Sequence, residues 1–133
     1  MVTLSGSCLC GAVRFGADGP VKRLNLCHCR MCQKAHGAAF APYARVDKDK
    51  FYFTAGEEHV KTFVSSPGIV RTFCGTCGSN LQWIRESSDG LGIAAGCLDT
   101  RLDMQPAAQF YCQESQAWHR LRDDVDTFAQ EYE

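Results

Sequence analysis

Short runs in which apolar and polar residues alternate recur along the chain, and turn residues separate them. Between positions 12 and 17, for example, Val13 and Phe15 alternate with Arg14 and Gly16. Alternation with a period of two predicts strands that bury one face. We expect such strands at 12–17, 23–27, 40–46, 51–54, 60–64, 69–73, 81–84, 91–95 and 109–112.

Turn signals interrupt these runs, and helical periodicity is scarce. The tripeptides Asp-Gly-Pro at 18–20, Ser-Pro-Gly at 66–68 and Ser-Asp-Gly at 88–90 all favour turns. One short helix is expected at 30–36, and 99–107 is expected to be a loop. Many short strands and few helices predict a mainly all-β domain of antiparallel sheets, with at most short helices.

Length and charge narrow the picture further. A chain of 133 residues with 45% apolar residues suits one domain, spanning 1–133, with a real core. The net charge of -1 gives no support for nucleic-acid binding, and no apolar run approaches the ~18–20 residues that span a bilayer. The first residues lack the charged and apolar regions of a secretory signal, so we expect a cytoplasmic protein.

Nine cysteines in a chain expected to lie in a reducing compartment need an explanation. Seven of them fall into three clusters: Cys8-x-Cys10, Cys27-x-Cys29-x-x-Cys32 and Cys74-x-x-Cys77. A disulfide framework is disfavoured, because the count is odd and no secretory signal is visible. Cysteines two or three positions apart instead suit thiolates that share one zinc ion, and glycines follow two of the clusters and permit tight turns.

A structural zinc site takes four ligands in a tetrahedron, and the two cysteine pairs supply four. Closing the loop of more than sixty residues between the pairs costs roughly 3–4 kcal/mol. Zinc binding contributes about 10–16 kcal/mol, which exceeds that cost. The triplet then stands alone, and three protein ligands with an open position are typical of a reactive zinc site.

Spacing alone leaves other assignments of these cysteines open. Cys74 and Cys77 could pair with two cysteines of the triplet instead of with the first cluster. Alternatively, His28, His36 or Cys97 could close the fourth position of the triplet and make that site structural.

The order of the motifs resembles the glutathione-dependent formaldehyde-activating family, often described together with the centromere-protein-V proteins. The resemblance runs from Gly6 to Asp99 and is carried by residues 6–13 (GSCLCGAV), 27–32 (CHCRMC), 37–40 (GAAF), 65–68 (SSPG), 73–79 (FCGTCGS) and 96–99 (GCLD). It implies a β-tent fold, in which small antiparallel sheets are stapled by zinc, as in methionine sulfoxide reductase B. The chain would then be a single zinc-binding domain of this family.

The resemblance also implies a division of labour among the cysteines, with two zinc ions per chain. The structural zinc would be held by Cys8, Cys10, Cys74 and Cys77, and a second zinc, which can be labile, by Cys27, Cys29 and Cys32. The implied activity is that of a carbon–sulfur lyase that joins glutathione to formaldehyde and gives S-(hydroxymethyl)glutathione. The expected partners are therefore a small thiol such as glutathione and an aldehyde, and the triplet cysteines would act as metal ligands, not as covalent nucleophiles.

Two other functions remain as alternatives to this lyase. The chain could be a zinc-stapled binding module without turnover, or a thiol–disulfide or sulfoxide reductase that uses a free cysteine such as Cys97. Arg30 and Lys34 flank the triplet, where they could attract an anionic thiol or simply form a solvated helix face.

Four further residues carry expectations that a structure can test. His28 is expected to point away from the metal and His119 to be solvated. Cys112, like Cys97, is expected to be a buried apolar residue, and Trp118 to belong to the core.

Overall fold

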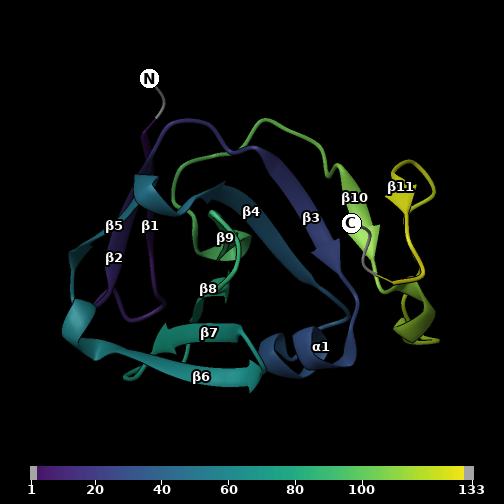
Figure 1. Cartoon of the computed structure of the whole chain (residues 1–133), viewed down its shortest axis with the longest axis horizontal. Helices are drawn as coiled ribbons and strands as arrows, with labels where there is room; N and C mark the ends of the chain where they lie inside the picture. The colour runs from purple at the N-terminus through teal and green to yellow at the C-terminus, as the bar shows by residue number, and fades with distance from the viewer. Residues whose placement is uncertain (1–2, 131–133) are drawn as a thin grey trace.

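The computed structural model describes residues 3–130 and is built mainly of strands (Figure 1). The strands are β1 (Thr3–Ser7), β2 (Arg14–Asp18), β3 (Arg23–Cys27), β4 (Ala41–Asp47), β5 (Phe51–Ala55), β6 (Val60–Ser66), β7 (Ile69–Cys74), β8 (Asn80–Arg85), β9 (Gly90–Ala94), β10 (Ala108–Phe110) and β11 (Asp126–Thr127). The helices are α1 (Arg30–His36) and the short 3-10 helices η1 (Lys48–Lys50), η2 (Glu57–His59), η3 (Ala95–Cys97) and η4 (Cys112–Glu114).

The strands form two sheets. The smaller sheet has the order β1-β2-β5, and the larger has the order β11-β10-β3-β4-β9-β8-β7-β6. Strand β10 pairs in parallel with β3 and β11, and the other pairs of named strands are antiparallel. Helix α1 lies where β3 ends and before β4 begins (Figure 1). The predictions of a mainly antiparallel all-β fold and of a helix at 30–36 are confirmed.

The main hydrophobic core is formed by residues from both sheets. Phe15 of the smaller sheet is 2% exposed, and Val46 and Ile93 of the larger sheet are fully buried. Ala44, two residues before Val46 on β4, is also fully buried. Because successive side chains of a strand point to opposite faces, Tyr43 and Arg45 lie on the other face of β4. That second face of the larger sheet carries the site described below.

Two local expectations differ from the structure. Strand β1 was not predicted, because its sequence TLSGS has little apolar content; it alternates nonetheless, with Leu4 and Gly6 buried. Trp118 was expected in the core but is 72% exposed, since it lies in an irregular segment after η4 that no strand holds against the core. Among residues 3–130, no helix is both long and apolar enough to cross a membrane.

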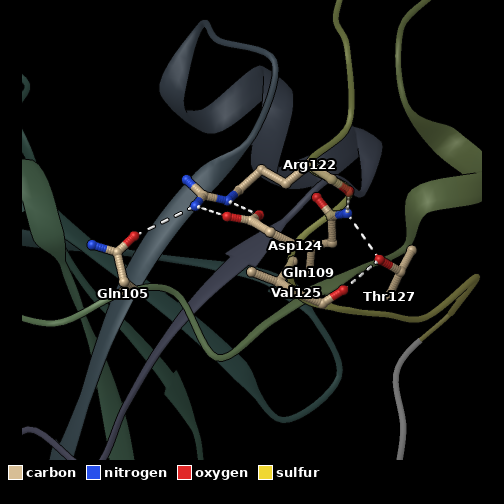
Figure 2. A network of polar contacts seen from close by, with 6 residues as sticks. All are labelled: Gln105, Gln109, Arg122, Asp124, Val125 and Thr127. Carbon is tan, nitrogen blue, oxygen red and sulfur yellow. Dashed lines mark hydrogen bonds and ion pairs between the residues drawn. The ribbon is translucent and has the colours of Figure 1, made fainter.

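A polar network fixes the C-terminal segment onto β10 (Figure 2). The buried Gln109 side chain donates from Nε2 to the Arg122 carbonyl oxygen at 2.7 Å and to Thr127 Oγ1 at 2.9 Å. Arg122 in turn holds Asp124 through an ion pair of 2.7 Å. Strand β10 is therefore held between β3 on one side and β11 on the other, and the residues that follow Gln109 reach the site from this fixed strand.

Candidate functional site

The first cysteine cluster joins two turns that are distant in sequence. Cys8 and Cys10 follow β1, whereas Cys74 ends β7 and Cys77 lies in the turn after it. Their four sulfurs all lie within 4.8 Å of one another, with Cys8 Sγ 3.6 Å from Cys10 Sγ and Cys10 Sγ 3.9 Å from Cys74 Sγ. Tetrahedral zinc bonded to sulfur at ~2.3 Å requires sulfurs ~3.8 Å apart, so this donor set fits a zinc ion.

Backbone amides and a hydroxyl surround these four sulfurs. The amide of Val13 donates to Cys8 Sγ at 3.3 Å, and the amide of Thr76 donates to Cys74 Sγ at 3.4 Å. Ser79, through its hydroxyl and its amide, lowers the pKa of Cys77 to about 5. Donors of this kind stabilise thiolates, and thiolate is the form in which cysteine binds a metal.

The second cluster lies within one short stretch of chain. Cys27 ends β3, Cys29 is the N-cap residue of α1, and Cys32 lies in its first turn; their three sulfurs are within 4.8 Å of one another. Helix capping helps to bring two of them together, because Cys29 Sγ accepts a hydrogen bond of 3.3 Å from the amide of Cys32. Cys29 and Cys32 are buried, at 8% and 1% exposure, whereas Cys27 is half-buried. The set supplies three thiolates, which fits a zinc ion with one further position.

A buried arginine and a tyrosine stand against the triplet. Arg71 is 7% exposed, and its guanidinium donates to Cys32 Sγ at 3.5 Å, to the Tyr43 hydroxyl at 3.1 Å and to Ser65 Oγ at 3.0 Å. The Tyr43 hydroxyl also lies 3.5 Å from Cys32 Sγ and 3.5 Å from His36 Nε2. Hydrogen bonds from the other two thiols of the triplet, from Tyr43 and from Arg71 lower the pKa of Cys32 against the effect of burial.

The histidines near the triplet do not join its group of sulfurs. His28 is fully buried; its Nε2 lies 3.3 Å from His119 Nε2, and its ring centroid is 5.4 Å from that of Phe40. Burial lowers the pKa of His28, which favours the neutral ring. His119 was expected to be solvated, but it is half-buried because its ring stacks on His28 at 5.3 Å.

The two remaining cysteines lie outside both clusters. Cys97 donates from Sγ to the carbonyl oxygen of Asn80 at 3.0 Å, and Cys112 is buried. Burial raises the pKa of both thiols. A thiol–disulfide reductase needs an exposed thiol of low pKa, so neither cysteine has the surroundings which that alternative requires.

A cavity of about 540 Å³ opens beside the triplet. All three triplet cysteines line it, together with aromatic residues and five arginines, namely Arg23, Arg30, Arg45, Arg71 and Arg85. Tyr111 also lines it and is the one non-glycine residue among 3–130 with positive φ, at 55°. Apart from Arg30, these arginines were missed from the sequence. One signal in the sequence could have placed Arg23 beside the triplet: Arg23 and Cys27 are four positions apart on the same strand, so their side chains lie on the same face.

Comparison with known proteins identifies the family of this chain. The family model described as "Glutathione-dependent formaldehyde-activating enzyme" (GFA) matches residues 3–114. The chain belongs to the GFA family. The resemblance found in the sequence is thereby confirmed.

A GFA relative and a solved structure extend this comparison. A protein of Halomonas elongata, described as "Putative glutathione-dependent formaldehyde-activating enzyme", is 38% identical over 89 residues, which are 61% of this chain and 55% of that protein. The match thus spans about half the length of that relative. A crystal structure of a Rhodobacter sphaeroides protein has a TM-score of 0.63 at 22% identity and covers 74% of this chain and 91% of that chain. This second likeness bears on the fold alone.

Proposed function

We propose that the chain is a zinc-dependent enzyme of the GFA family that acts on a thiol adduct. The candidate reaction is that of a carbon–sulfur lyase which joins glutathione, or a related thiol, to formaldehyde or a related aldehyde. The observation that carries this proposal is the triplet of cysteines, whose three sulfurs lie within 4.8 Å of one another at the wall of a cavity of about 540 Å³. Three donors leave one ligand position for a small molecule that enters from the cavity.

The two donor sets support two metal sites with different roles. The structural zinc would be held by Cys8, Cys10, Cys74 and Cys77, and the second by Cys27, Cys29 and Cys32. A zinc ion in the triplet would act as a Lewis acid that favours the thiolate form of a bound thiol near neutral pH. The GFA family name and the description of the Halomonas elongata relative support glutathione and formaldehyde as the substrates to test first.

The chain's own residues have defined tasks in this reaction. Arg71 places a positive charge 3.5 Å from Cys32 Sγ, where it offsets the negative charge of the thiolates. The Tyr43 hydroxyl is positioned by Arg71 and lines the cavity, so its single O–H can turn from Cys32 Sγ to the aldehyde oxygen as negative charge develops there. The substrate sulfur attacks the aldehyde carbon, and the thiol proton ends on the new hydroxyl group. The reaction therefore balances without an oxidant or a reductant.

A Cys29→Ser variant tests the proposal, with Cys112→Ser as its matched control. The wild-type protein and the Cys112→Ser control should each contain two zinc ions per chain and accelerate adduct formation from glutathione and formaldehyde, followed by NMR. Cys29→Ser should fold, keep one zinc ion and lose the acceleration, because two thiolates hold the second ion too weakly. Retention of two zinc ions or of full turnover by Cys29→Ser would exclude the triplet as the reactive site. One zinc ion in the wild type with no turnover would favour the binding module.

A further inference from the structure

One residue at the cavity has an unusual backbone conformation. Strand β10 ends at Phe110, and the chain then turns into η4 through Tyr111, which has φ 55° and ψ 37°. This left-handed region is crowded for a residue with a Cβ atom, and a bulky residue there is a genuine outlier. The other positive φ angles among residues 3–130 belong to six glycines, namely Gly11, Gly19, Gly37, Gly56, Gly68 and Gly78. In that part of the chain, only Tyr111 keeps a side chain in this conformation.

Hydrogen bonds of the backbone fix Tyr111 from both sides. The carbonyl oxygen of Phe110, just before it, accepts a hydrogen bond of 2.9 Å from the amide of His28. The amide of Cys112, just after it, donates to the carbonyl oxygen of Phe128 at 3.1 Å. Strained residues persist where the surrounding structure holds them in this way, and they gather at active sites and ligand-binding sites. The strain at Tyr111 therefore directs attention to its side chain.

The side chain of Tyr111 lies against the triplet. It packs on the small buried cluster formed by Cys29, Cys32 and Ala41, and it lines the cavity. Tyr111 is half-buried, so the ring covers the cluster without being enclosed by it. Tyr43 packs on the same cluster and also lines the cavity. Two tyrosines therefore adjoin the triplet on its cavity side.

The two tyrosines reach the triplet from different strands. Strand β3 lies between β10 and β4 in the larger sheet. In the strand register, Cys27 at the end of β3 faces Phe110 of β10 and Ala41 of β4. Tyr111 directly follows Phe110, and Tyr43 lies two residues after Ala41. The triplet is thus bordered by one tyrosine from each neighbour of β3.

We propose that Tyr111 is a specificity-determining residue whose ring restricts the open position of the triplet to unbranched thiols, in which a methylene group carries the sulfur. A ligand that reaches this position from the cavity passes beside the Tyr111 ring, and a backbone fixed on both sides prevents the ring from giving way. Additional methyl groups next to the sulfur would collide with the ring, since closely packed sites tolerate surplus volume poorly. A cysteinyl thiol, that of glutathione included, is of the unbranched kind. The proposal rests on the proposed function, in which a thiol binds at the triplet.

N-acetylcysteine and N-acetylpenicillamine are matched probes for this restriction. They differ only in two methyl groups on the carbon that bears the sulfur, and the acetyl group removes an amine that would otherwise chelate the metal. Each is titrated at pH 8 into the full chain loaded with cobalt, and the thiolate-to-cobalt charge-transfer bands are recorded. Changes that are absent from Cys29→Ser are assigned to the triplet. The ratio of the two affinities is the measured quantity, because incomplete metal loading affects both thiols alike.

The wild type should bind N-acetylcysteine at least about tenfold more tightly than N-acetylpenicillamine, a difference in keeping with surplus methyl groups in a closed site. Tyr111→Ala and, independently, Tyr111→Gly should each lower this ratio at least about threefold. Tyr111→Phe keeps the ring and should keep the ratio. Tyr52→Ala is the matched control, because Tyr52 is 40% exposed, belongs to β5 and does not line the cavity.

Thermal melting of the same variants measures the backbone strain. Tyr111→Ala and Tyr111→Gly both remove the ring, but only alanine keeps a Cβ atom in the left-handed region. Tyr111→Gly should therefore melt a few degrees above Tyr111→Ala, followed by circular dichroism. A lower melting temperature for Tyr111→Gly would contradict the strained conformation from which the proposal starts.

The proposal is wrong if the wild type binds the two thiols equally well, or if Tyr111→Ala and Tyr111→Gly keep the wild-type ratio as Tyr52→Ala does. A ratio that falls equally in Tyr111→Phe would contradict the role of the ring. Failure of the proposed function gives different results. If neither thiol changes the triplet bands in any variant, both thiol coordination and the restriction are refuted. Selectivity between the thiols without turnover of glutathione and formaldehyde would refute the lyase alone.

Discussion

The two cysteine clusters offer the same donor atoms in different surroundings. In the four-cysteine cluster, the sulfurs meet one another, the backbone amides of Val13 and Thr76, and the Ser79 hydroxyl. In the triplet, Cys32 Sγ instead meets the side chains of Arg71 and Tyr43, at a wall of the cavity. Four thiolates complete a tetrahedron, whereas three leave a position that faces charged and polar groups. The same residue type therefore has a different number of donors and different surroundings in the site proposed to hold the fold together and in the site proposed to act on a substrate.

The clusters also differ in which parts of the chain they connect. Cys10 and Cys74 are 64 residues apart, and they follow strand β1 of the smaller sheet and end strand β7 of the larger sheet, respectively. The triplet spans only residues 27–32, which belong to the end of β3 and the start of α1. Loss of the first cluster therefore removes a link between the two sheets, while loss of the second removes only a local one.

The largest expected effect is that of Cys74→Ser. This change removes a buried ligand of the four-cysteine cluster, and zinc binding of about 10–16 kcal/mol is comparable to or larger than the net stability of a domain, about 5–15 kcal/mol. We expect little soluble folded protein and no cooperative thermal transition by circular dichroism. Cys29→Ser should keep a cooperative transition under the same conditions.

Equal losses of stability in Cys74→Ser and Cys29→Ser would contradict the difference between the two clusters. A Cys74→Ser protein that kept the wild-type melting temperature and one tightly bound zinc ion would show that this cluster is not the structural site.

A smaller effect is expected for Arg71→Gln, which keeps hydrogen-bonding capacity but removes the positive charge next to Cys32. Groups that hydrogen-bond to metal ligands typically change metal affinity by about 10–100-fold. We expect a loss of this size at the triplet, measured by competition with a chromophoric chelator, and no change at the four-cysteine cluster. Arg71→Lys, which restores the charge without the planar fork, should recover part of the affinity.

Equal zinc affinity in Arg71→Gln and the wild type would contradict the role of Arg71 in charge compensation. Equal loss at both clusters would indicate a general effect of the buried substitution, and circular dichroism of Arg71→Gln serves as the check on folding.

The parts of the fold that were predictable from the sequence are local. The helix Arg30–His36 has a thiol N-cap and a C-cap glycine, Gly37, with φ 60°, so its limits depend on a few neighbouring residues. Strand β3 likewise coincides with the alternation at 23–27. Strand β1 was missed because its burial depends on the neighbouring strand β2 and not on its own TLSGS sequence.

The candidate site was predictable only in its cysteines. Their spacing within each cluster is local, but the contact between Arg71 and Cys32 joins residues 39 positions apart. That contact depends on the strand order β3-β4-β9-β8-β7, which alternation along one strand does not contain. The arginines of the cavity therefore became visible only when the strands were placed side by side.

Cobalt substitution followed by titration with glutathione tests the central claim most directly, because thiolate-to-cobalt charge-transfer bands report on the metal's ligands. If the triplet has a position open to a thiol, the bands of the triplet should change saturably at millimolar glutathione, while those of the four-cysteine cluster stay constant. Cobalt-substituted Cys29→Ser should show no such change. Bands of the triplet that remain unaltered at millimolar glutathione in the wild type would contradict the account that the triplet binds the substrate thiol.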